Sequence, residues 1–213
     1  MFCSSINRDG EKMTAVSKYG WKMAFAGMFF MMAAGQVSAA VDVAGIKYEE
    51  SVSLGGKQLV LNGAGVRNKF TVKVYAAGLY LQDAQTTVDG VMKADGPRRM
   101  HLVMLRDISA DDLGSAFMVA LTENINPADK AKIVTQISKY GEMFSQVSFL
   151  KKGDTIDTDW IPGVGNQCYV NGKKVGPVIP DILFYNSVLR VWLGDKPVDS
   201  ALKAKLLVLP AKK

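Results

Sequence analysis

Three polar side chains, Arg67, Tyr75 and Asn124, have the chemistry to bind a small ligand. A guanidinium beside a phenol suits a carboxylate, because arginine donates two parallel hydrogen bonds and the phenol adds a third. Each residue also has a simpler interpretation that involves no ligand. Arg67 could be a solvated arginine at a strand end, Tyr75 a half-buried sheet tyrosine, and Asn124 the residue that ends a helix.

Two of these residues belong to a segment that alternates like a β-strand. Residues 62–65 are rich in glycine and indicate a turn, and a strand is predicted to follow from Arg67 to Leu81. An unbroken strand places Arg67 and Tyr75 on one face, about four residue pairs apart. Small residues at positions 76–78 would leave space on the sheet for a ligand or for a closely packed helix.

The remaining chemistry-bearing residues exclude several classes of enzyme. His101 is the single histidine of the sequence, so common zinc sites and Ser-His-Asp catalysis lack their central residue. We expect His101 to be a packed core or edge residue of a strand. Asp157 and Asp159 are predicted to face water. No metal site, cofactor or catalytic residue is therefore predicted.

The order of elements predicts an α+β fold. Strands are predicted around residues 46–48, 57–61 and 99–106, and again over 155–161, 167–170 and 173–175. Ser109 and Asn126 have the sequence context of helix N-caps, and Asn171-Gly172 indicates a tight hairpin. Further helices are predicted over residues 86–93, 181–193 and 200–206. Strands, helices, strands and a helix in this order favour an antiparallel sheet with helices gathered on one face, in one domain over residues 40–213.

The first 39 residues have the three-part pattern of a secretory signal. Lys18 and Lys22 precede an apolar segment over residues 23–34, and small residues surround the predicted cleavage point after Ala39. Export to the periplasm is therefore expected, with an uncleaved anchor as the alternative and either Met1 or Met13 as the start. Cleavage would leave Cys168 as the single cysteine, which excludes an internal disulfide and predicts a buried thiol.

Charge gives little indication of a macromolecular partner. The sequence has a formal net charge of +6, and its lysines are scattered rather than interleaved with aromatic residues. Nucleic acid is therefore not expected as a partner. The pattern specifies no oligomeric state.

Three segments resemble the chalcone isomerase family, particularly its bacterial and fatty-acid-binding branches. They are residues 65–81, which include Val72-Lys73-Val74-Tyr75, then Leu121-Thr122-Glu123-Asn124, and residues 184–198. The similarity extends over about residues 43–207. It implies an open-faced β-sandwich in which helices cover one face of a large antiparallel sheet.

The resemblance also has implications for single positions. Arg67 matches the ligand-facing arginine of the family, and Asn124 matches an asparagine of its central helix. Position 75 is threonine in the plant isomerases but tyrosine, as here, in the fatty-acid-binding members. Phe117 aligns with a catalytic tyrosine of the plant enzymes and lacks its hydroxyl. These differences imply binding without catalysis.

The resulting hypothesis is an exported, non-catalytic protein that binds a fatty acid or a similar amphipathic carboxylate. The ligand would be held by three polar residues and lined by three apolar ones: Arg67, Tyr75 and Asn124, with Met104, Phe117 and Leu121. One alternative is an isomerase or lyase that acts on an unsaturated carbonyl compound. Another is an envelope interaction module whose pocket is vestigial.

Overall fold

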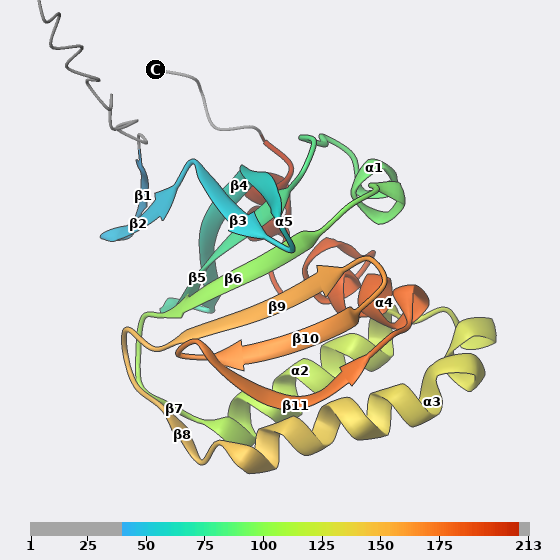
Figure 1. Ribbon diagram of the computed structural model, residues 1–213. Helices are drawn as coiled ribbons and strands as arrows, with labels where there is room; N and C mark the ends of the chain where they lie inside the picture. Colours follow the sequence, from blue (N-terminus) through green and yellow to red (C-terminus); the bar gives the residue numbers. More distant parts are fainter. Residues whose placement is uncertain (1–39, 209–213) are drawn as a thin grey trace, which may run out of the picture. The chain divides into compact units, whose positions relative to one another are not determined.

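A seven-stranded antiparallel sheet organises residues 40–208, the part of the chain that the computed structural model describes. Figure 1 shows the strands in the order β11-β10-β9-β6-β5-β4-β3. In chain order they are β3 (Ser51–Leu54), β4 (Lys57–Lys69), β5 (Val72–Leu81), β6 (Arg98–Met104), β9 (Thr155–Ile161), β10 (Gly165–Val170) and β11 (Lys173–Ile179). Two short antiparallel ribbons add β1 (Ala40–Val43) with β2 (Ile46–Glu49), and β7 (Ile108–Ser109) with β8 (Phe149–Leu150). The predicted secretory segment, residues 1–39, lies outside the described residues.

Two of the five helices of residues 40–208 begin directly after the predicted N-caps Ser109 and Asn126. The five helices are α1 (Val88–Lys93), α2 (Ala110–Asn124), α3 (Pro127–Gly141), α4 (Ile182–Leu193) and α5 (Ser200–Leu206), with a 3₁₀ turn, η1 (Glu142–Gln146), after α3. Ser109 accepts a hydrogen bond from the N–H of Asp112 at 3.1 Å, and Asn126 accepts one from the N–H of Ala128 at 3.0 Å. Asn171 and Gly172, with φ of 50° and 72°, make the predicted hairpin between β10 and β11.

The two faces of the sheet are covered by different elements, as the predicted fold class requires. Helices α2, α3 and α4 lie along one face (Figure 1), where they pack against Leu79, Met100 and Ile156. The β1–β2 ribbon contributes Tyr48 to a smaller cluster on the opposite face, together with Leu59 and Leu61. The prediction of an α+β fold with a large antiparallel sheet and helices on one face is confirmed.

The segment from residue 62 to 81 is a hairpin of two strands, so the prediction of an unbroken strand from Arg67 is wrong. β4 continues to Lys69, the chain turns at Phe70 and Thr71, and β5 begins at Val72. Arg67 and Tyr75 are direct cross-strand partners in this hairpin. They share one face, as expected, but as neighbours rather than as residues four pairs apart.

The glycines of residues 62–65 serve packing and do not form the predicted turn. Gly63 and Gly65 lie within β4, where α5 approaches the strand so closely that a Cβ on Gly65 would lie 2.9 Å from the Lys205 side chain. Gly78 has the same role on the opposite face, where a Cβ would lie 2.6 Å from the ring of Tyr48. The space expected beside residues 76–78 is therefore filled by Tyr48.

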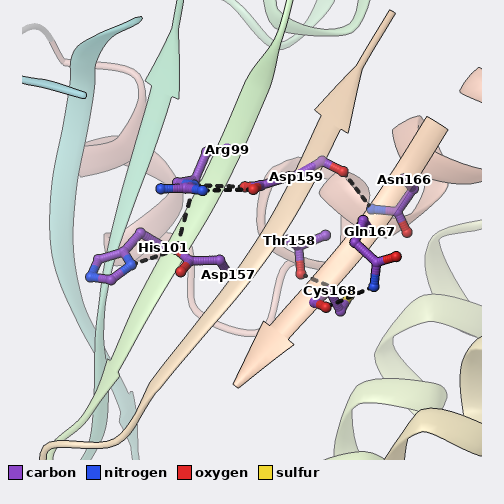
Figure 2. Close-up of polar contacts among 8 residues, drawn as sticks. All are labelled: Arg99, His101, Asp157, Thr158, Asp159, Asn166, Gln167 and Cys168. Carbon is purple, nitrogen blue, oxygen red and sulfur yellow. Dashed lines mark hydrogen bonds and ion pairs between the residues drawn. The ribbon is translucent and has the colours of Figure 1, made fainter. Parts of the chain in front are cut away.

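The prediction that Asp157 and Asp159 face water is also wrong. Both lie on β9, a central strand, and the side chain of Asp159 is 1% exposed. Figure 2 shows Arg99 of β6 meeting both oxygens of Asp159, with Nε and Nη2 at 2.6 Å each. His101 Nδ1 lies 2.6 Å from Asp157 Oδ1 in the same cluster. We call Arg99, His101, Asp157 and Asp159 the far-face cluster.

Candidate ligand-binding site

Arg67 is a buried cation without a charged partner. It lies near the end of β4, is 9% exposed, and its Nε has no hydrogen-bond partner among residues 40–208. No carboxylate of the described chain lies within 4.0 Å of its guanidinium nitrogens. The ring of Tyr75 lies beside it, with its centroid 5.4 Å from the guanidinium carbon. A buried charge in this situation favours an anion that the chain does not itself supply.

Tyr75 lies opposite Arg67, and its hydroxyl accepts one hydrogen bond from the fold. The indole Nε1 of Trp192, on α4, donates a hydrogen bond to this hydroxyl at 2.9 Å. A phenol that accepts one hydrogen bond still has its own proton to donate. Burial raises the pKa of Tyr75 to about 12, against the opposing effects of the Arg67 charge and the Trp192 hydrogen bond. The phenol therefore keeps its proton at neutral pH and adds a second donor beside Arg67.

A small apolar cavity begins at this pair and extends between the sheet and the helices. Its volume is about 40 Å³, enough for about three water molecules. Phe117 lines this cavity, and its ring lies 5.5 to 6.0 Å, centroid to centroid, from the rings of Tyr140, Phe144 and Trp192. The full lining consists of Arg67, Tyr75, Leu102, Leu113, Ala116, Phe117, Tyr140, Met143, Phe144, Ile156, Thr158, Val191, Trp192 and Val198.

The cavity has a second polar point, made by Tyr140 of α3 and Thr158 of β9. The thiol of Cys168 lies 3.1 Å from the Tyr140 hydroxyl and 3.6 Å from the Thr158 hydroxyl. These three groups satisfy one another within the core, and burial raises the pKa of Tyr140 well above its usual value. Burial also raises the pKa of the Cys168 thiol to about 11. The expectation of a buried thiol is confirmed.

A larger groove opens on the surface side of Arg67. It has a volume of about 530 Å³ and shares Arg67, Leu113 and Ala116 with the cavity. The turn of the β4–β5 hairpin and the β7–β8 ribbon form its rim. Arg67 therefore lies between an interior cavity and an open groove.

Three of the six predicted site residues line neither space. Asn124 ends α2 and donates to the carbonyls of Ala120 and Lys196 at 2.8 and 2.7 Å, while its oxygen accepts the N–H of Lys196. These bonds attach α2 to the segment after α4, so the structural alternative for Asn124 is the one observed. Met104 and Leu121 are 0% exposed in the core. The structure brings together Arg67, Tyr75 and Phe117.

Sequence reasoning missed Trp192 and Tyr140 as parts of the site. Trp192 lies on a helix that is apolar around most of its circumference, which predicts burial but not a hydrogen bond to Tyr75. Tyr140 lies on the buried stripe of α3, where a tyrosine is usual in a core. Both side chains reach the cavity because of the way α3 and α4 cross the sheet, and no local sequence pattern indicates that crossing.

The described residues contain no group of three or more metal-ligating side chains that could hold a metal ion. No helix among these residues is long and apolar enough to cross a membrane.

Comparisons with known proteins agree with this fold. A family model described as chalcone isomerase-like matches residues 40–208. The chain belongs to the chalcone isomerase-like family. A fatty-acid binding protein of Arabidopsis thaliana shares the chalcone isomerase-like fold at a TM-score of 0.64 and 17% identity, over 76% of this chain and 92% of that one. No curated protein sequence matches this chain significantly.

The resemblance found in the sequence is thus confirmed, and it clarifies position 117. In this chalcone isomerase-like chain the side chain at position 117 does face the cavity, as the alignment with the plant enzymes implied. A phenylalanine there contributes only apolar surface. The hydroxyls that line the cavity come instead from Tyr75, Tyr140 and Thr158.

Proposed function

We propose that the protein binds a fatty acid or a similar amphipathic carboxylate, with the carboxylate held by Arg67 and Tyr75. The observation that carries this proposal is that the Arg67 guanidinium lines both the cavity and the groove, while its buried Nε has no partner among the described residues. A ligand carboxylate would accept charge-assisted, bidentate hydrogen bonds from this guanidinium and pair its charge. The free hydroxyl proton of Tyr75 would complete the recognition of the carboxylate.

The surroundings of Arg67 fit an apolar chain better than a second polar group. Leu113, Ala116 and Phe117 lie beside it, and each buried methylene of a ligand contributes about 0.8 kcal/mol. A fatty-acid binding protein with the same fold, the one from Arabidopsis thaliana, supports the choice of ligand class.

The size of the cavity imposes a condition on this proposal. A volume of about 40 Å³ does not accommodate an acyl chain. The acyl chain must either extend into the groove or displace the rings of Phe117 and Phe144, which line the cavity. We propose the second route. The ring of Phe144 lies directly against Gly114. A Cβ at position 114 would be 2.7 Å from the Phe144 Cγ, so any larger residue there would have to shift this ring.

Titration of the delipidated protein with cis-parinaric acid, a fluorescent fatty acid, tests the function. The wild-type protein should bind it, and Arg67→Met should weaken binding by about 30-fold or more, because the carboxylate loses its charged partner. Arg106→Met is the matched control, since it removes one arginine from the exposed rim of the groove. Its affinity should stay within about threefold of wild type. Equal affinity in wild type and Arg67→Met would exclude the proposed site.

A second candidate function is an isomerase or lyase acting on an unsaturated carbonyl compound. The observation in its favour is that the hydroxyls of Tyr140 and Thr158 line the cavity together with Arg67. Their contacts with Cys168 and the raised pKa of Tyr140 make them poor acids toward a substrate. Following the absorbance of a chalcone decides between the two functions, because a rate equal to that in buffer rules out the enzyme.

We also propose that the protein is exported to the periplasm and processed near Ala39. The basic, apolar and small-residue segments of residues 1–39 support this proposal. N-terminal sequencing of the protein recovered from a periplasmic extract should begin near Ala40. Recovery of the intact N-terminus from the cytoplasm would contradict it.

A further inference from the structure

The tip of the β4–β5 hairpin exposes an aromatic side chain that nothing in the fold explains. Phe70 is 94% exposed and adopts a left-handed backbone conformation with φ of 56°. Glycine and asparagine adopt this conformation most readily, and a bulky residue there is strained. The position therefore carries two costs, exposed apolar surface and backbone strain, without a packing benefit within the described chain.

Phe70 is one of three exposed apolar residues on the rim of a single groove. Val72 is 42% exposed and Phe149 is 49% exposed, and all three line the groove of about 530 Å³ that Arg67 also lines. Val72 follows the hairpin turn, and Phe149 lies on β8, which pairs with β7 just before α2 (Figure 1). We call Phe70, Val72 and Phe149 the apolar rim.

Basic side chains surround the apolar rim. Lys69 and Arg106 line the groove, Lys73 pairs across the hairpin with Asn68, and Lys151 and Lys152 follow Phe149. Five carboxylates share this region, and three of them accept hydrogen bonds from backbone N–H groups. Asp107 accepts the N–H of Lys152 at 2.8 Å, Asp154 accepts that of Lys151 at 2.8 Å, and Asp199 accepts that of Asn68 at 2.9 Å. Asp111 and Asp112, in the first turn of α2, are the other two.

We propose that the apolar rim and these lysines dock on the surface of an anionic lipid bilayer, which places the groove and Arg67 against the source of an amphipathic ligand. Exposed aromatic and aliphatic side chains enter the boundary between headgroups and acyl chains, and lysines contribute about 1 kcal/mol each near an anionic surface. The apolar and the electrostatic contributions to the binding free energy are both small, so we expect the membrane binding to be reversible. This inference rests on the proposed fatty-acid site, because docking serves to bring a lipid carboxylate to Arg67.

The geometry favours a bilayer over a protein partner. Phe70 stands at the tip of a two-stranded hairpin, and the lysines flank the apolar rim, as in segments that insert a few side chains between headgroups. A protein interface more often provides a pocket or a flat, closely packed surface. Association of two copies of the chain through the same rim is the competing outcome of the test.

Co-sedimentation with phosphatidylcholine vesicles that contain phosphatidylglycerol tests the docking. Wild-type protein should bind these vesicles and bind pure phosphatidylcholine vesicles less. Phe70→Asn should reduce vesicle binding by about tenfold and should not lower the stability of the fold, because asparagine tolerates φ of 56°. Phe149→Thr tests the other strand of the rim if Phe70→Asn does not fold. Val134→Gln, which changes a residue 58% exposed on α3, is the matched control and should bind like wild type. All variants share the same N-terminal segment, so any effect of that segment cancels.

The fatty-acid site is tested separately with cis-parinaric acid below its solubility limit and without vesicles. Phe70→Asn should keep its affinity for the fatty acid in solution, whereas Arg67→Met should lose fatty-acid binding but keep vesicle binding. Failure of the docking is therefore distinguishable from failure of the site. Equal vesicle binding by Phe70→Asn, Phe149→Thr and wild type would overturn the docking. So would a rim-dependent dimer in sedimentation experiments that binds no vesicles.

Discussion

Two arginines on opposite faces of the sheet, Arg99 and Arg67, differ in whether a carboxylate pairs with them. Arg99 meets both oxygens of Asp159 at 2.6 Å within the far-face cluster (Figure 2). Arg67 faces the helices, and its Nε has no partner among residues 40–208. Burial alone therefore does not identify a functional arginine. The paired arginine stabilises the sheet, and the unpaired one is available for a ligand.

Neighbouring groups strengthen the same contrast. The bond to Asp159 raises the pKa of Arg99, despite the burial that favours its neutral form. The charge of Arg67 acts on the carboxylate of Asp199, which accepts hydrogen bonds from the backbone N–H groups of Asn68 and Leu202. Burial tends to raise the pKa of Asp199, but these backbone bonds and the charge of Arg67 outweigh it and lower the pKa. Asp199 thus acts on Arg67 through its charge, but the two make no ion pair within 4.0 Å.

The largest expected effect is on the far-face cluster. Arg99→Met should lower the free energy of unfolding by about 3–5 kcal/mol, because Asp159 would be left buried and unpaired. Urea denaturation followed by circular dichroism measures the change. The double variant Arg99→Met/Asp159→Leu should recover most of the loss, since no charge then remains. A single variant as stable as wild type would show that the pair has no structural role.

Arg67→Met should behave in the opposite way. Removal of an unpaired buried charge should leave the free energy of unfolding unchanged or increase it, while the fatty-acid affinity falls by about 2–3 kcal/mol. The two arginine variants thus separate stability from binding when both are measured by urea denaturation and by titration. A strong loss of stability in Arg67→Met would mean that Arg67 has a structural partner after all.

Acidification gives a signature that only the far-face cluster should show. Burial raises the pKa of Asp159, and its bonds to Arg99 oppose that effect. Without Arg99 the folded-state pKa rises further above the unfolded value of about 4. The folded state then binds more protons, so Arg99→Met should regain about 1–2 kcal/mol as the pH falls from about 7 to about 5. Urea denaturation across this range measures it, and a further loss of stability on acidification would contradict the account.

The smallest expected effect concerns Tyr75. Tyr75→Phe removes the acceptor for Trp192 Nε1 and the proposed donor to the ligand. We expect a loss of about 1 kcal/mol in unfolding free energy, and a loss of fatty-acid affinity smaller than that of Arg67→Met. Titration of Tyr75→Phe and Arg67→Met with the same fatty acid under the same conditions compares their two affinities directly. A larger loss of affinity for Tyr75→Phe would make the phenol, and not the guanidinium, the main contact.

Features with a local cause were predictable from the sequence. The caps at Ser109 and Asn126 and the Asn171-Gly172 hairpin depend on residues within one turn of each other, and all three are observed. The turn at Phe70 was not predictable, because its left-handed conformation belongs to a residue that rarely adopts it. Strand pairing between β4 and β5 holds that conformation in place.

Features with a tertiary cause were missed or misplaced. Glycines at positions 63 and 65 indicate a turn until α5 is seen to pack on them. Alternation placed Asp159 in water, because a sequence does not show that the second face of a central strand is also covered. Within the site, Arg67, Tyr75 and Phe117 were predictable from the family resemblance, but Trp192 was not. Its role depends on where α4 crosses the sheet.

The most direct test of the central claim is carbon-13 NMR of a carboxyl-labelled fatty acid bound to the protein. A carboxylate paired with Arg67 should stay ionised, and its resonance should not move, as the pH falls through the range in which the free acid titrates. The same resonance in Arg67→Met should titrate or should be absent because the ligand no longer binds. A bound carboxyl that titrates alike in both proteins would contradict a site built on Arg67.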